Sequence, residues 1–72
     1  MLLTNGQAQA FYDALEALDR LDSPFGADIQ IMDWTYARRT YLTGAVHVEN
    51  RASGVIEKYN SKEELAAAYH LD

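Results

Sequence analysis

The segment TYLTGAVHVE, residues 40–49, decides the predicted fold because apolar and polar side chains alternate along most of it. Leu42, Val46 and Val48 occupy one set of alternate positions, which is the pattern of a β-strand with one buried face. Gly44 belongs to the same set, where a missing side chain indicates a bend or the close approach of another backbone. We therefore expect a strand here with one face in a core.

Further strands are expected on both sides of this segment. Residues 50–54 (NRASG) are rich in turn formers and 55–59 form a short strand, so a hairpin is expected. Before it, residues 28–36 (DIQIMDWTY) are rich in β-branched and aromatic residues and predict another strand. Its alternation changes phase near Met32, which indicates two partly covered faces or a bulge. A turn is expected near residues 37–39, although no glycine or asparagine marks it.

A helix is predicted before the strands, at residues 7–21. Apolar side chains recur there at helical spacing on one side, with charged side chains on the other. Thr4 or Asn5 is expected to cap its first turn. The Ser-Pro pair at 23–24 is expected to end it, because the residue before a proline avoids the helical conformation.

A second helix is predicted after the strands, at residues 62–71. Ser61 and Glu64 have the spacing of a capping box. A helix this short is not stable alone in water, so it must pack against the sheet. The predicted fold is a small two-layer α+β domain over residues 1–72. Its order is α-β-β-β-α, a three-stranded antiparallel meander packed against two helices.

The composition limits the class of protein. The chain has 72 residues, and 49% of them are hydrophobic, which suits a globular domain and not a disordered chain. There is no cysteine, so disulfides and thiolate metal sites are excluded. This fits a reducing compartment, and we expect the cytoplasm, or the host cytoplasm if a phage encodes the chain. No apolar run reaches the roughly 20 residues of a membrane span, so no membrane partner is expected.

The formal net charge of −5 is carried by the first half of the chain. Residues 1–36 contain six acids and one base, whereas residues 37–72 contain five of each. A negative surface repels nucleic acid and attracts basic proteins, so the expected partner is another protein with a basic surface. The alternative is an ordinary solvated surface that keeps the protein soluble. The candidate residues of this acidic surface are Asp13, Glu16, Asp19, Asp22, Asp28 and Asp33.

A second candidate surface lies between residues 34 and 41. Tryptophan, tyrosine and arginine alternate there, and these residue types are enriched among interface hot spots. The same mixture could stack on single-stranded nucleic acid through Arg38, Arg39 and the aromatics. The remaining alternative is that Trp34 fills the core. The candidate residues of this surface are Trp34, Tyr36, Arg38, Arg39 and Tyr41.

Catalytic motifs are missing from the sequence. None of the serines lies in a Gly-x-Ser-x-Gly motif, and the four glycines are isolated, so no phosphate-binding loop is expected. His47 and His70 are too far apart in sequence for the spacings typical of metal sites. We therefore expect no enzymatic activity, no cofactor and no metal.

These features predict a small acidic protein-binding module. Its expected role is a stoichiometric inhibitor or adaptor of a macromolecular complex, including one that handles nucleic acid. In size, acidity and build the chain is similar in type to phage-encoded inhibitors of the anti-CRISPR kind. No motif carries this similarity, so no residue role follows from it. The alternatives are a nucleic-acid-binding regulator that uses Arg38 and Arg39, and a homodimer that pairs exposed sheet edges.

Overall fold

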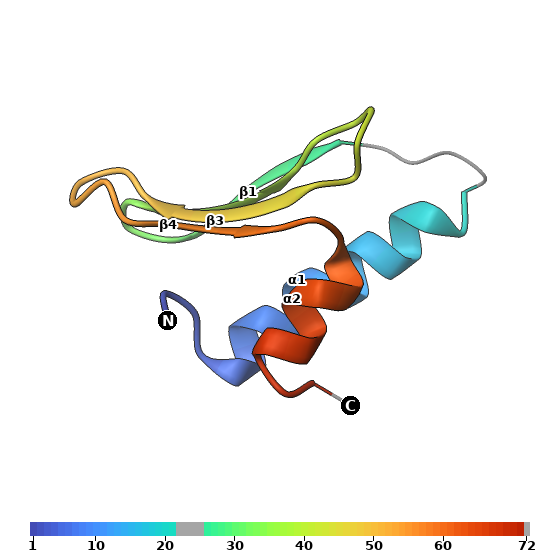
Figure 1. Cartoon of the computed structure of the whole chain (residues 1–72), viewed down its shortest axis with the longest axis horizontal. Helices are drawn as coiled ribbons and strands as arrows, with labels where there is room; N and C mark the ends of the chain where they lie inside the picture. Colours follow the sequence, from blue (N-terminus) through green and yellow to red (C-terminus); the bar gives the residue numbers. More distant parts are fainter. Residues whose placement is uncertain (22–25, 72) are drawn as a thin grey trace.

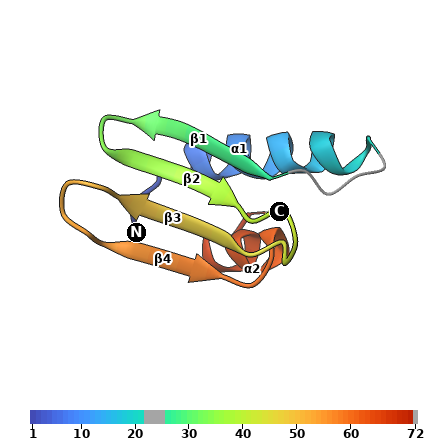
Figure 2. The same cartoon turned by 90° about the horizontal axis from the view of Figure 1, so that it is seen from above.

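The computed structural model describes residues 1–21 and 26–71, which form a sheet with two helices on one of its faces (Figure 1). The elements of the described chain are α1 Asn5–Asp19, β1 Ala27–Met32, β2 Thr35–Arg39, β3 Val46–Asn50, β4 Ile56–Tyr59 and α2 Lys62–Ala68. The strands pair antiparallel in the order β1-β2-β3-β4 (Figure 2). The predicted α+β class and antiparallel meander are confirmed. The predicted number of strands is wrong, because the sheet has four strands and not three.

One strand was missed in the prediction because residues 28–36, predicted as a single strand, contain the turn of the β1–β2 hairpin. Asp33 and Trp34 form this turn, which explains the change of phase near Met32. The register also shifts between Gln30 and Met32, a bulge or similar irregularity where the sequence offered a bulge as one of two alternatives. Trp34 has a φ of 67°, a left-handed conformation that glycine or asparagine normally supplies in a hairpin. A tryptophan in this position gives no sequence signal for a turn.

Because the turn at Asp33 and Trp34 was missed, the predictions for residues 37–39 and 40–45 are also wrong. Residues 37–39, expected as a turn, belong to β2, and Ala37 is completely buried. Residues 40–45, expected as the first half of a strand, connect β2 to β3. Gly44 has a φ of 72° in this connection and does not bend a strand, and no backbone approaches it closely. Leu42, expected in the core, is therefore 87% exposed.

Helix α1 has the predicted cap at Thr4, but it begins at Asn5, two residues before the predicted start, and it ends earlier than predicted. The Thr4 hydroxyl accepts a hydrogen bond from the Gln7 N–H at 3.1 Å, and the Gln7 side-chain oxygen accepts one from the Thr4 N–H at 2.9 Å. The last helical residue is Asp19, and Leu21, expected on the apolar face, is 65% exposed. The expected stop at residues 23–24 lies outside the described residues.

Helix α2 starts with half of the predicted capping box. The Ser61 hydroxyl accepts a hydrogen bond from the Glu64 N–H at 3.2 Å, as predicted. The Glu64 carboxylate accepts a hydrogen bond from the Asn60 N–H at 2.9 Å, one residue before the expected donor. The helix ends at Ala68, which is short of the predicted end at residue 71.

The core lies between the helices and the sheet face that they cover. The core residues of β2 and β3 lie at alternate positions along each strand, which is the period of two expected for strands. It consists of Leu3, Ala8, Phe11, Leu15, Ala37, Val46, Val48, Leu65 and Tyr69.

A polar cluster around Glu57 joins β4, α2 and the N-terminal segment on this covered face. The Glu57 carboxylate accepts hydrogen bonds from the Tyr69 hydroxyl at 2.5 Å, the Tyr59 hydroxyl at 3.2 Å and the Leu2 N–H at 2.8 Å. Burial raises the pKa of the Tyr69 phenol above its usual value, which keeps its proton available for this bond. These polar groups therefore help to hold the two layers together.

Candidate functional site

The sheet face away from the helices is not covered by any element of the described chain (Figure 1). We call it the open face. It carries the side chains that alternate with the buried residues of each strand. The strand register arranges them in two rows across the sheet. One row is Asp28, Arg38, His47 and Lys58, and the other is Gln30, Tyr36, Glu49 and Ile56.

Arg51 contacts an aromatic ring and two carboxylates of the open face. Its guanidinium carbon lies 3.6 Å from the centroid of the Tyr36 ring, a cation–π contact. One of its terminal nitrogens lies 3.4 Å from each oxygen of Asp28, and its Nε lies 3.2 Å from a Glu49 oxygen. Arg38 lies 4.0 Å from the same carboxylate of Glu49. The cations and carboxylates of this cluster therefore largely neutralise one another.

Arg51 and Glu49 were not among the sequence-predicted site residues. Arg51 lies in a segment that the sequence identified as a turn, and a turn has no periodicity from which to infer the direction of a side chain. Glu49 was placed on a strand, but its partners come from β2 and from the following turn. Neither relationship is visible in the local sequence.

Exposed apolar side chains gather at one end of the sheet. The β1–β2 and β3–β4 turns lie side by side there (Figure 2), and the Trp34 carbonyl accepts a hydrogen bond from the Arg51 N–H at 2.7 Å. Trp34 is 62% exposed, so the interpretation of this residue as core is wrong. Val55 and Ile56 are also about half exposed. This end of the sheet presents apolar surface beside the charged cluster.

The structure does not assemble the predicted acidic surface. Asp13 is exposed on α1, and Glu16 lies on the same helix, where its hydrogen bond with Tyr12 raises the pKa of that phenol. Asp28 and Asp33 belong instead to β1 and the turn after it. The helix and the open face are on opposite sides of the molecule (Figure 1). Asp22 lies outside the described residues.

Two of the predicted interaction residues have structural contacts instead. Asp19 lies 2.8 Å from an Arg39 nitrogen and 2.6 Å from the Lys62 ammonium, which joins α1 to β2 and α2. The Arg39 side chain is 5% exposed. A guanidinium buried to this extent does not reach a partner surface, so the expectation that Arg39 contacts nucleic acid or protein is wrong.

The pH dependence of folding follows from this ion pair. Hydrogen bonds from Lys62 and then Arg39 hold the pKa of the Asp19 carboxyl below its usual 3.8. The bond to Asp19 raises the pKa of the Lys62 ammonium above its usual 10.5. Because the Asp19 pKa is lower in the folded chain, the carboxylate stabilises the fold at pH values above the pKa of the unfolded chain. This contribution is lost as the pH falls through the folded pKa. Because the Lys62 pKa is higher in the folded chain, the ammonium stabilises the fold at pH values below the pKa of the unfolded chain. This contribution declines as the pH rises from that value through the folded pKa.

We therefore predict that Asp19→Asn is less stable than the parent between about pH 5 and pH 9. The difference in unfolding free energy should shrink below about pH 4 and above about pH 10.5. Urea titrations followed by circular dichroism at a series of pH values measure this difference. A difference that stays constant from pH 3 to pH 11 would contradict the assigned ion pair.

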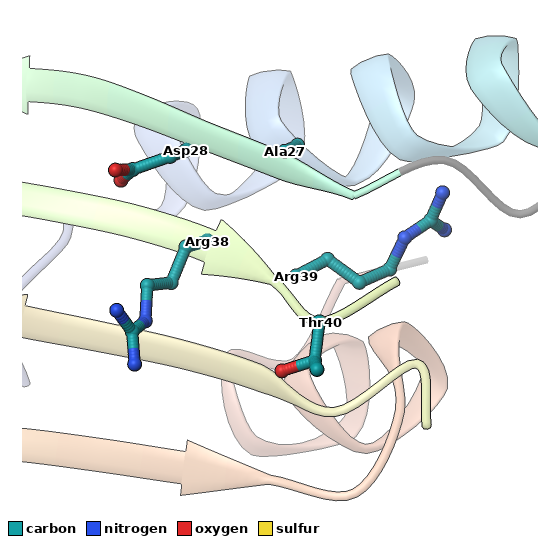
Figure 3. A pocket seen from close by; sticks show the side chains of 5 residues that line it. All are labelled: Ala27, Asp28, Arg38, Arg39 and Thr40. Atoms are coloured by element: carbon teal, nitrogen blue, oxygen red, sulfur yellow. The ribbon is translucent and has the colours of Figure 1, made fainter. Parts of the chain in front are cut away.

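A hollow lies at the end of the sheet opposite Trp34. It encloses about 330 Å³ and is lined by Ala27, Asp28, Arg38, Arg39 and Thr40. Its charged side chains diverge instead of pointing to one centre (Figure 3). Tyr41, the last candidate residue, follows in the β2–β3 connection and is 54% exposed. This hollow does not bring together the groups that a reaction centre requires.

Two kinds of feature are absent from residues 1–21 and 26–71. These residues contain no group of three or more histidine, cysteine, aspartate or glutamate side chains placed to hold a metal ion. They also contain no helix with the length and apolar character needed to cross a bilayer.

Comparisons with protein-family models, with curated proteins and with solved structures found no match for this chain. The assignment of a function therefore depends on the residues and geometry of the open face.

Proposed function

We propose that the protein is a binding module that docks the open face of its sheet on another protein. It acts stoichiometrically, as an inhibitor or adaptor, and the action needs no chemical step. The inhibitor role, including one of the anti-CRISPR kind, and a cytoplasmic location belong to this proposal. They are supported by the size, charge and composition of the chain, while the docking surface is supported by its geometry.

The observation that carries the proposal is the conformation of Trp34. Left-handed backbone costs a residue with a side chain roughly 1–2 kcal/mol, and Trp34 adopts it with a φ of 67°. Its ring remains 62% exposed, so burial in the core does not offset this cost. Backbone strain of this kind is concentrated at functional sites. An exposed tryptophan is also among the most frequent hot spots of protein interfaces.

The charged cluster beside Trp34 supports the same surface. Arg51, Tyr36, Asp28 and Glu49 hold one another in place before any partner arrives. Side chains that are ordered in advance lose less conformational entropy on binding. The chain as a whole carries a net charge of −5, which favours a partner with a basic surface.

The open face also weighs against the nucleic-acid alternative. Of the two arginines that would serve it, Arg39 is buried and Arg38 lies beside Glu49. Arg51, the other arginine of this face, contacts two carboxylates. Cations already close to carboxylates bind phosphates weakly, because a phosphate must compete with a nearby negative charge.

Site-specific photo-crosslinking tests the docking surface. A benzophenone side chain is introduced either at His47, in the middle of the open face, or at Ala17, on the exposed side of α1. We expect the His47 variant, in cells that naturally make the chain, to crosslink to another protein. An excess of the parent chain should compete for this crosslink, and the Ala17 variant should not form it.

Other outcomes would contradict the proposal in distinct ways. A crosslink from Ala17 but not from His47 would move the docking surface to the acidic side of α1. A product that nuclease digests would favour the nucleic-acid-binding alternative. A crosslink between two copies of the chain alone would favour the homodimer.

A further inference from the structure

The open face already contains one bound guanidinium, that of Arg51. The group stacks on the Tyr36 ring with 3.6 Å between the guanidinium carbon and the ring centroid. Asp28 and Glu49 supply carboxylate oxygens at its edge, at 3.4 Å and 3.2 Å. An aromatic face combined with a carboxylate at the edge is the arrangement that a planar cation favours.

A pocket with the same chemical groups lies next to it. This pocket encloses about 350 Å³, opens to solvent, and is lined by Gln30, Asp33, Trp34 and Tyr36. We call it the Trp34 pocket. It offers an exposed indole face, a carboxylate and a side-chain amide that can accept a hydrogen bond. Among the described ion pairs, none involves Asp33.

We propose that the Trp34 pocket binds an arginine side chain of the partner protein. The guanidinium stacks on Trp34, and Asp33 accepts its hydrogen bonds as Asp28 and Glu49 do for Arg51. This inference rests on the proposed function, because it names the group that the docking surface recognises. The net charge of −5 favours the approach of a cation.

Arginine fits this site better than lysine for a geometric reason. The guanidinium is planar and weakly hydrated, so it can stack on an aromatic ring while its edge donates hydrogen bonds. An ammonium is a compact and strongly hydrated charge, and it cannot use the ring face and the carboxylate through one flat group. The pocket should therefore distinguish the two cations.

Fluorescence provides a direct test because Trp34 is the only tryptophan in the chain. The probes are hexa-arginine and hexa-lysine peptides, titrated at low ionic strength. We expect hexa-arginine to change the Trp34 emission and to bind several-fold more tightly than hexa-lysine. Equal affinity for the two peptides, or binding without a change in emission, would overturn the assignment.

A matched pair of variants separates the pocket from a general attraction between opposite charges. Asp33→Asn and Asp13→Asn each remove one negative charge, but Asp13 lies on α1, on the other side of the molecule. We expect Asp33→Asn to weaken hexa-arginine binding by about fivefold, the upper range for an exposed ion pair. Asp13→Asn should change it by less than about twofold. Equal losses for the two variants would overturn the assignment.

The peptide titration and the crosslinking experiment fail independently. If the His47 crosslink forms but the peptides do not distinguish the Trp34 pocket, the open face docks a partner without an arginine in this pocket. If the peptides bind as expected but no crosslink forms from His47, the arginine site stands and the proposed docking surface is wrong.

Discussion

The variant Asp19→Ala is expected to lose about 3 kcal/mol of unfolding free energy, the typical cost of removing one partner of a buried ion pair. Its carboxylate lies 2.8 Å from Arg39 and 2.6 Å from Lys62, and the two cations are 5% and 15% exposed. Removing the carboxylate takes away the acceptor that the two largely buried cations share, and Lys62 keeps Glu63 at 3.0 Å. A domain of this size has a total stability of roughly 4–11 kcal/mol, so the loss is a large fraction of it.

Asp13→Ala is the matched control, because it removes an exposed carboxylate from the same helix. Its effect on the unfolding free energy should stay within about 0.5 kcal/mol. Urea denaturation followed by circular dichroism measures both variants. Equal stabilities for the two variants would show that the ion pair does not hold the layers together.

This result also decides how the acidic residues should be tested for binding. A variant that reverses Asp19 together with Asp13 and Glu16 would lose stability, and a loss of binding would then have no clear cause. Asp13 and Glu16 alone form the correct pair for testing α1 as a docking surface.

The variant Trp34→Gly is expected to weaken partner binding strongly while keeping the fold intact. Relief of the left-handed strain, about 1–2 kcal/mol, offsets the extra chain entropy of glycine, about 0.5–1 kcal/mol. We therefore expect the unfolding free energy to stay the same or rise by up to about 1 kcal/mol. Loss of a tryptophan hot spot should weaken partner binding by at least about thirtyfold.

Tyr41→Ala is the control for an exposed aromatic side chain. Tyr41 is 54% exposed and lies in the β2–β3 connection, at the opposite end of the sheet from Trp34 (Figure 2). Its removal should change the affinity by less than about twofold. A marked loss of stability in Trp34→Gly would show that the indole packs as part of the fold, and unchanged binding would remove it from the interface.

The helices and the fold class could be predicted because their signals are local. Apolar spacing and the hydroxyl of Thr4 specify α1, and Ser61 specifies the start of α2. The number of strands could not be predicted in the same way. A hairpin turn is usually revealed by glycine or asparagine, and here Trp34 adopts the left-handed conformation instead. This turn residue is also the one on which the proposed function rests.

The candidate site could be predicted only in part, because a sequence shows charges but not their partners. Trp34, Tyr36 and Asp28 were identified from residue type, and the structure places Tyr36 and Asp28 on the open face and Trp34 in the turn at one end of it. Arg39 was chosen on the same grounds, but the sheet register turns it toward Asp19. Arg51 was missed because it contacts Tyr36 and Asp28, which lie on other strands and are distant in sequence.

Nuclear magnetic resonance of the ¹⁵N-labelled chain tests the open face most directly once crosslinking has identified the partner. On addition of that partner, we predict that the Trp34 indole signal and the amide signals of Gln30, Tyr36 and Glu49 shift or broaden. The amide signals of Asp13 and Ala17 on the outer side of α1 should stay in place. Changes confined to α1, with the Trp34 indole signal unaffected, would contradict the proposed docking surface.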